Sequence, residues 1–315
     1  MGAIAKLLFG ISPAETTVAR RGFRGGDSAA CEHIERIGRT FADAYHAALE
    51  DDCLERLAPR LDRVEREFRG FAYEGAAMGL ALLDRLTLWR RDRVRKFLSG
   101  AGEPHTYMVH VAIGWVAARL PGKIERVLKP LDPLLRWLVV DGYGFHEGFF
   151  HWPRYINGQF IPRRLRGYAC RAFDQGFGRS LWFVDGADVT LIPRTIAGFA
   201  VERQGDLWSG IGLASTYAGG ADGVALKALR ESAGAYQPQL AQGAAFAAKA
   251  RERAGNLTAG TQVAARIFCG VSAEEAAYIT DAALENLPAS GPQPAYEIWR
   301  WRIQEKMNRI RELQK

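Results

Sequence analysis

The segment 141–152 concentrates more groups capable of chemistry than any other stretch of the chain. It reads Asp-Gly-Tyr-Gly-Phe-His-Glu-Gly-Phe-Phe-His-Trp and contains two carboxylates, two histidines and five aromatic rings. A titratable group held against aromatic rings can have its pKa shifted towards neutrality, where proton transfer is most useful. We therefore predict Asp141 and His146 as catalytic residues, with Asp141 orienting the imidazole if a helix begins between them. The alternative is a capped helix that carries a core histidine.

Glu74 is the third predicted catalytic residue. It lies in the segment 69–80 among small and apolar residues, at the start of a predicted helix. Burying a carboxylate there costs several kcal/mol unless the group is paired or protonated. A helix N-terminal carboxylate bound by backbone amides fits the same sequence equally well.

Two glycine-rich segments, 174–183 and 203–220, supply further polar candidates. Arg179 and Asp206 carry opposite charges and are predicted to form an ion pair, with Asp174 as the cap of the helix that carries Arg179. Glycines at this density allow two helices, or a backbone and a ligand, to approach closely. The predicted substrate-binding residues are Tyr143, Phe145, Glu147, Phe149, Trp152, Arg179, Asp206 and Trp208.

Motifs of the common cofactor, metal and hydrolase classes are incomplete. His146 and His151 are five residues apart, which on a straight helix separates them by about 140° and prevents shared zinc ligation. The acidic residues at 51–55 follow a predicted helix end in an Arg-rich, solvated stretch. The sequence contains no P-loop, no complete dinucleotide loop and no GxSxG elbow. We therefore predict that the protein uses no metal and no cofactor.

Composition restricts the class of protein and its environment. The 315 residues are 48% apolar and 24% charged, as in globular proteins, and the net charge of +7 favours anionic partners. The four cysteines are widely spaced, and no apolar run reaches the roughly 18–20 residues that span a bilayer. These features predict a cytoplasmic protein without a transmembrane segment. The basic clusters at 90–96 and 163–166 lack a recognisable nucleic-acid-binding fold, so we expect no nucleic-acid partner.

Hydrophobic periodicity predicts helices along most of the chain. Only 182–192 is rich enough in β-branched and aromatic residues to suggest a strand. The sequence therefore predicts an all-α or predominantly α protein. The predicted helices span 28–50, 53–67, 75–99, 105–120, 223–235, 240–254, 260–268, 273–286 and 294–314.

The two halves of the chain resemble each other. Gly38-Arg39-Thr40-Phe41 matches Gly178-Arg179-Ser180-Leu181, and three further pairs of segments follow in the same order. A tandem duplication predicts two pseudo-repeated helical halves with a pocket between them. The alternative is that glycine-rich helix starts look alike by chance. The predicted parts are an N-terminal arm, the two pseudo-repeats and a C-terminal helix, at 1–20, 21–160, 161–290 and 291–315.

Several long segments of the sequence resemble the UnbL-type bacterial proteins, a family of unknown function found among the accessory genes for enediyne warhead biosynthesis. The resemblance extends from about residue 21 to about residue 305. It implies a role beside an iterative polyketide synthase, in turning a linear polyene into a cyclic product, and it assigns no catalytic residues. The segments that carry the resemblance are FRGFAYEGAAMG, LVVDGYGFHEGFFH, DQGFGRSLWF, DLWSGIGLASTYAGG, LAQGAAFAAKAR and PAYEIWRWRIQ.

Two classes of function remain open on the sequence. The first is an enzyme of secondary metabolism, a cofactor-independent cyclase or isomerase that acts on a hydrophobic polyene by acid–base chemistry. Asp141, His146 and Glu74 supply the acid and the base within a dry, aromatic-lined pocket. The second is a non-catalytic protein that binds the polyene or holds a polyketide synthase or another pathway protein. An apolar tunnel without convergent titratable groups would favour the second class.

Overall fold

The computed structural model describes residues 2–87, 89–288 and 291–313, and within these ranges it contains helices and no β-strand. The predicted all-α class is confirmed. The strand suggested at 182–192 is wrong, because Trp182 and Phe183 belong to the last turn of α10 (Tyr168–Val184) and a turn then leads into α11 (Leu191–Ala197). These aromatic side chains are buried against neighbouring helices, so tertiary packing overrides their local strand preference.

The helices are grouped, in chain order, by the predicted N-terminal arm, two halves and C-terminal helix. The arm contains α1 (Gly2–Phe9), a 3₁₀ turn (Pro13–Thr16) and α2 (Val18–Arg21). The first half contains α3 (Ser28–Glu50), α4 (Leu54–Asp62), α5 (Arg69–Leu86), α6 (Arg93–Leu98), α7 (Thr106–Arg119), α8 (Ile124–Leu128) and α9 (Arg136–Gly158). The second half continues from α10 and α11 with α12 (Val201–Ala218), α13 (Gly223–Ser232), α14 (Gln237–Arg253), α15 (Ala259–Cys269) and α16 (Ala273–Ala282).

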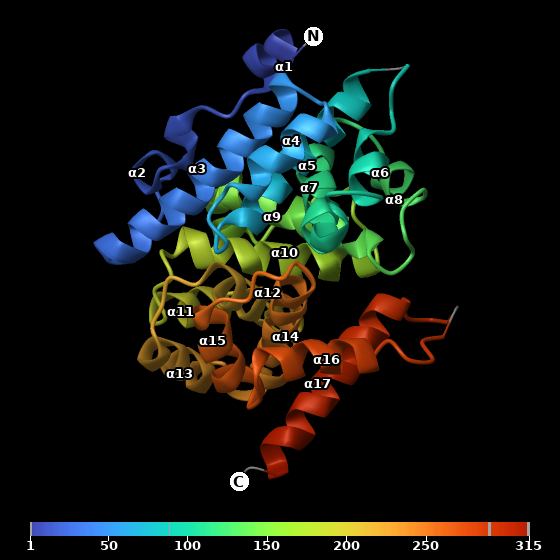
Figure 1. Ribbon diagram of the computed structural model, residues 1–315. Coiled ribbons are helices and arrows are strands. Elements are labelled where there is room, and N and C mark those ends of the chain that lie inside the picture. The colour runs from blue at the N-terminus through green and yellow to red at the C-terminus, as the bar shows by residue number, and fades with distance from the viewer. Residues whose placement is uncertain (1, 88, 289–290, 314–315) are drawn as a thin grey trace.

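The long helices pack against one another in chain order. Thus α3 packs on α5, α5 on α7, α7 on α9, α9 on α10, α10 on α12, α12 on α14 and α14 on α16. In Figure 1, α10 crosses the middle of the molecule between the blue-green first half and the yellow-orange second half. A 3₁₀ turn precedes the third long helix of each half, at Glu103–His105 and Gly234–Tyr236. That the halves superimpose stays a prediction.

Glycines allow these helices to approach at backbone distance. A Cβ added to Gly144 of α9 would overlap the carbonyl oxygen of Phe173 on α10, and one added to Gly176 would overlap that of Asp141 on α9. A Cβ added to glycines of α7, α12 or α14 would likewise overlap backbone atoms of a neighbouring helix. Such spacing permits Cα–H···O contacts that a larger residue would prevent. At these positions the dense glycines predicted from sequence therefore serve helix–helix packing.

Two helices begin earlier than their sequence pattern predicts. α5 begins at Arg69, so Glu74 lies in its second turn and does not cap its N-terminus. α9 begins at Arg136, so Asp141 lies within the helix and no helix start separates it from His146. Neither helix has a side-chain cap, whereas α3, whose start was predicted, has the carboxylate of Asp27 bound to the amide of Ala30 at 2.8 Å.

The C-terminal helix α17 (Ala295–Leu313) packs on α14, α15 and α16. Its Tyr296, Trp299, Ile303 and Met307 side chains are buried in those contacts. Arg300 is fully buried and donates to Asp206 at 2.7 Å and to Gln242 at 3.1 Å. The helix is therefore fixed to the second half by both apolar packing and a buried ion pair.

Candidate functional site

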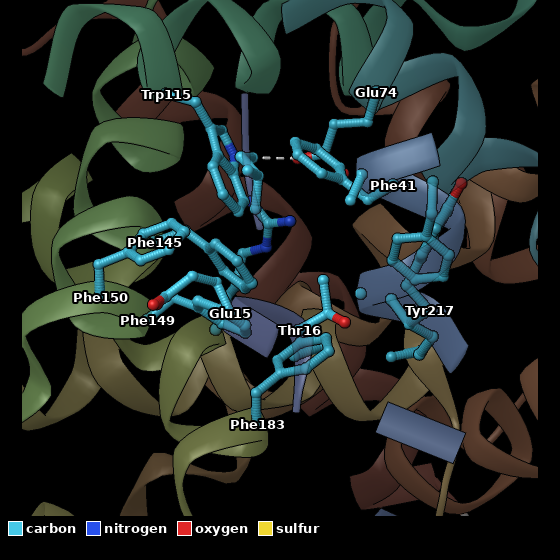
Figure 2. A pocket seen from close by; sticks show the side chains of 18 of the residues that line it. Glu15, Thr16, Phe41, Glu74, Trp115, Phe145, Phe149, Phe150, Phe183 and Tyr217 are labelled. Atoms are coloured by element: carbon cyan, nitrogen blue, oxygen red, sulfur yellow. Dashed lines mark hydrogen bonds between the residues drawn. The ribbon is translucent and has the colours of Figure 1, made fainter. Parts of the chain in front are cut away.

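A narrow apolar cavity lies where α3, α5, α7 and α9 of the first half meet α10 and α12 of the second (Figure 2). Its volume is about 50 Å³. The cavity is therefore narrow. Its rings include Phe41, Trp115, Phe145, Phe149, Phe183 and Tyr217.

The aromatic walls are held in place by ring–ring contacts. Phe41 of α3 stacks on Trp115 of α7, with ring centroids 4.5 Å apart. Phe145 and Phe149 stack on one face of α9 at 5.9 Å, and Trp115 lies 5.3 Å from Phe145. The faces of such rings carry negative electrostatic potential, so they attract positive charge that develops beside them.

Glu74 brings a carboxyl group into this apolar cavity. Its side chain is 3% exposed, and the indole Nε1 of Trp115 donates to its Oε1 at 3.2 Å (Figure 2). Burial raises the pKa of Glu74 to about 7 and the charge of Asp141 adds to that effect, while Arg179 and the Trp115 hydrogen bond oppose it. Near neutral pH the group can therefore both donate and accept a proton.

Asp141 and Arg179 form a buried ion pair at the inner end of the cavity. Arg179 Nη1 donates to Asp141 Oδ1, and Gln175 Nε2 donates to Asp141 Oδ2 at 2.8 Å. Gln175 also donates to the hydroxyl of Tyr296 on α17 at 3.0 Å. The Asp141 carboxylate is therefore fully engaged by α10, which faces it across the glycine contacts between α9 and α10.

The predicted pairing of Arg179 with Asp206 is wrong. Asp206 instead accepts from Arg300 and from Arg171 Nε, at 2.7 and 2.9 Å, and lies away from the cavity. Asp174 does not cap α10; it lies in the second turn and binds Arg203 of α12. Arg179 faces α9 because it lies more than one helical turn beyond Asp174 and on another side of α10.

His146 and Glu147 lie outside the cavity, in a shallower hollow beside the N-terminal arm. Burial lowers the pKa of His146, and neighbouring Glu147, whose Oε1 is 3.4 Å from His146 Nδ1, opposes the shift. Tyr155 donates to Glu147 Oε2 at 2.5 Å. The prediction that Asp141 orients His146 is wrong, because five residues of continuous helix place the two on different faces of α9.

The other predicted substrate-binding residues divide between the cavity and the packing around it. Phe145, Phe149 and Arg179 line the cavity. Tyr143, Trp152 and Trp208 are not among its lining residues. The Tyr143 hydroxyl accepts from Arg164 Nε at 3.1 Å, Trp152 Nε1 donates to the carbonyl of Arg21 at 3.1 Å, and Trp208 is buried within α12.

Several cavity residues were missed from the sequence. Trp115 was included only in the helix predicted at 105–120. Phe41 was included only in the helix predicted at 28–50 and in the resemblance between the two halves. Tyr217 lies in a glycine-rich segment that was singled out, yet it was not selected. A signal existed for Trp115, because a buried indole N–H requires an acceptor and few polar side chains in the first half were predicted to be buried.

The described residues form no metal-binding cluster and no membrane-spanning helix. Among the described residues, no group of three His, Cys, Asp or Glu side chains is arranged to hold a metal ion. The His146 and His151 rings lie 6.2 Å apart, because the backbone at His151 departs from helical geometry. Within the same described ranges, no helix combines the length and apolarity needed to cross a bilayer.

The family model described as "Protein of unknown function (DUF1702)" matches residues 1–307. The chain belongs to this family. No curated protein and no solved structure matches the sequence or the fold. The description of this family assigns no activity to its members.

Proposed function

We propose that this DUF1702 chain binds a linear polyene in the aromatic cavity and converts it to an isomeric or cyclic product by acid catalysis from Glu74. One observation carries the proposal: Glu74, whose pKa burial raises to about 7, lies among aromatic side chains in a narrow apolar cavity. The other acidic residue in the described lining, Glu15, is paired with Arg20 and Arg21.

The chemistry requires no cofactor. Protonated Glu74 transfers its proton to an alkene carbon, and the π electron pair forms the new C–H bond. The resulting cation is delocalised along the polyene and lies beside the faces of Trp115, Phe145 and Phe149. A second alkene attacks the cation when a ring closes, forming a C–C bond. The Glu74 carboxylate then removes a proton from a neighbouring carbon, so the product is an isomer of the substrate and the carboxyl group is restored.

Exclusion of water supports this assignment. A carbocation in contact with water would be captured as an alcohol, whereas an apolar, closely lined cavity prevents this side reaction. The N-terminal arm contributes Ile11, Glu15 and Thr16 to the lining. Arg21 holds the arm by pairing with Glu15 at 2.5 Å and by donating to the carbonyl of Phe149 at 3.1 Å.

The biological setting comes from the resemblance to UnbL-type proteins. On that basis the protein is a cytoplasmic accessory enzyme of bacterial secondary metabolism, and its polyene comes from an iterative polyketide synthase in an enediyne-type pathway. The catalytic assignment moves from His146 and Asp141 to Glu74, since His146 lies outside the cavity and Asp141 is paired with Arg179.

A second candidate is a non-catalytic polyene-binding protein. It is favoured by the absence of a separate base beside Glu74 among the described cavity residues, since the only other acidic residue in the lining, Glu15, is paired with Arg20 and Arg21. In this alternative the cavity shields a reactive polyene and delivers it to another pathway protein.

Co-expression with the polyene-producing synthase tests the proposal. We expect the wild-type chain to yield a product of the same mass as the polyene but with shorter-wavelength absorption, because conjugation is interrupted. Glu74→Gln should leave only the linear polyene, while Glu35→Gln, which changes a carboxylate outside the cavity, should behave as wild type. Wild-type conversion by Glu74→Gln would overturn acid catalysis, and binding without conversion by the wild-type chain would establish the second candidate.

A further inference from the structure

A wide pocket lies on the first half of the chain, apart from the aromatic cavity. Its volume is about 600 Å³, and its walls include residues of α5, α6, α7 and α8 and of the segments that follow α7 and α8. In Figure 1, α6 and α8 lie beside each other at the edge of the first half. Pockets of about 300–1,000 Å³ enclose whole small-molecule ligands. No residue lines both this pocket and the aromatic cavity, so it is a separate candidate binding site.

One wall of this pocket is aliphatic. Its side chains come from three helices and from the segments that join α7 to α9, and all of them are half-buried. Aliphatic surface that water still reaches in a concave site is stabilised when an apolar ligand covers it. This wall therefore fits an apolar chain. Its side chains are Leu98, Ile113, Leu120, Val127, Leu131 and Leu135.

Two guanidinium groups meet at Gly122, on the exposed side of the pocket. Arg164 Nη1 donates to the carbonyl of Gly122 at 3.3 Å. Arg85 Nη2 would lie 3.7 Å from a Cβ added to the same glycine. Both arginines line the pocket. Like charges held near one residue repel each other, so the position favours an anion that both can bind.

No carboxylate in the described part of the chain pairs with either of these arginines. Arg85 has neither an ion pair nor a hydrogen bond there. Arg164 donates to the carbonyls of Ala117 and Gly122 and to the hydroxyl of Tyr143, all of them uncharged groups. The positive charge of both side chains is therefore available to a ligand.

The acidic and imidazole groups of the lining do not cancel this charge. Asp84 is paired with Arg93, which lies outside the lining, and Asp132 accepts hydrogen bonds from the backbone amides of two residues of its own loop. Burial lowers the pKa of His110, so this side chain is neutral at physiological pH.

The pocket also joins the two basic clusters of the sequence. Arg91 and Arg95 belong to the cluster at 90–96, and Arg164 belongs to the cluster at 163–166. Together with Arg85, four arginines line the pocket against two aspartates. The folded chain thus gathers charge that is far apart in sequence around one apolar hollow.

We infer that this pocket binds an amphiphile that carries one anionic head group, a carboxylate or a phosphate, on an apolar chain. Arg85 and Arg164 bind the head group beside Gly122, because a guanidinium offers paired N–H donors to either oxyanion. The apolar chain lies along the aliphatic wall. This site goes beyond the proposed function, because Glu74 and the aromatic cavity take no part in it.

Isothermal titration calorimetry with the full chain tests the inference. The probes are decanoate, decyl phosphate and the neutral decanol, with acetate and inorganic phosphate as head groups without a chain. We expect the preferred ten-carbon anion to bind at least about 10-fold more tightly than decanol and at least about 100-fold more tightly than its free head group. The order of decanoate and decyl phosphate identifies the head group. Equal affinity for decanol and both ten-carbon anions would overturn the inference.

Arg85→Gln is the decisive variant. Arg85 is exposed and lies in the last turn of α5, so the substitution removes charge from the pocket without removing a contact of the described structure. We expect the affinity for the preferred anion to fall at least about 5-fold and that for decanol to stay within about 2-fold. Arg63→Gln is the matched control, because Arg63 is an exposed arginine at the end of α4 and lines neither pocket. Unchanged anion affinity in Arg85→Gln would overturn the inference.

Glu74→Gln separates this site from the aromatic cavity. We expect its affinity for the preferred anion to stay within about 2-fold of wild type, because Glu74 does not line the wide pocket. A change of affinity in Glu74→Gln with none in Arg85→Gln would place the amphiphile in the aromatic cavity and overturn the inference. These titrations measure no conversion of a polyene, so their result and that of the co-expression experiment are independent.

Discussion

Glu74 differs from the other deeply buried carboxylates in its surroundings. Asp141, Asp174, Asp185 and Asp206 each accept a hydrogen bond from an arginine, whereas the hydrogen-bond donor to Glu74 among the described residues is the neutral indole of Trp115. Burial raises the pKa of Glu74 to about 7 although the charge of Arg179 opposes the shift, and it raises the pKa of Asp174 to about 6 although Arg203 binds that carboxylate. Glu74 is distinguished by its position in the lining of the aromatic cavity, where it can donate a proton to a ligand.

The raised pKa of Glu74 predicts a measurable dependence of stability on pH. Between the ordinary pKa of 4.5 and the folded-state pKa of about 7, the folded chain retains a proton that the unfolded chain releases. The free energy of unfolding therefore falls as the pH rises through this window, by about 3 kcal/mol from this group, and the contribution is fully present only below pH 4.5.

Urea unfolding of the wild-type chain and Glu74→Gln at pH 5 and pH 8 isolates this contribution, because other titrating groups cancel in the difference. We expect the stability of Glu74→Gln relative to wild type to rise by about 2–3 kcal/mol between the two pH values. A difference that stays constant across the window would contradict the raised pKa.

At the scale of single elements, the contact between α9 and α10 determines where the site residues lie. Gly176 of α10 allows the carbonyl of Asp141 to approach so closely that the Asp141 side chain reaches Arg179 and Gln175. We expect Gly176→Ala to force the two helices apart and to lower the free energy of unfolding by about 2–4 kcal/mol. Thermal or chemical denaturation measures the change.

Gly158→Ala provides the control for this prediction. Gly158 is the last residue of α9, and an added Cβ would meet nothing within 4 Å. We expect its stability to stay within about 1 kcal/mol of wild type. If Gly176→Ala were as stable as Gly158→Ala, close packing at the glycines would not be what holds α9 and α10 together.

Most of these helices were predicted from the sequence, but few of the contacts between them were. The helices at 28–50, 105–120 and 240–254 were predicted to within a few residues, because amphipathic periodicity and glycine or proline boundaries are local signals. The starts of α5 and α9 were missed, because both helices are hydrophobic on most sides and begin without a capping side chain. Which side chains pair, as Asp141 and Arg179 do, depends on how each helix is rotated about its own axis. Local sequence patterns do not specify that rotation.

At the scale of the whole molecule, the aromatic cavity is built from both halves of the chain. Its lining residues come from the N-terminal arm, from α3, α5, α7 and α9 of the first half and from α10 and α12 of the second. A pocket between the halves was predicted from their resemblance, and Glu74, Phe145, Phe149 and Arg179 in its lining were among the predicted site residues. Which of the predicted residues share the cavity was not predicted, since Glu74 and Arg179 are 105 positions apart in sequence. Only the packing of the complete chain brings them to one site.

The most direct test of the account is the rate of polyene conversion by the wild-type chain and by Glu74→Gln between pH 5.5 and pH 9, with polyene affinity measured alongside. We expect the wild-type rate to fall as the pH rises through about 7, because only protonated Glu74 donates. We expect Glu74→Gln to bind the polyene within about 3-fold of wild type but to convert it at least about 100-fold more slowly. A wild-type rate in Glu74→Gln, or a rate independent of pH through this range, would contradict acid catalysis by Glu74.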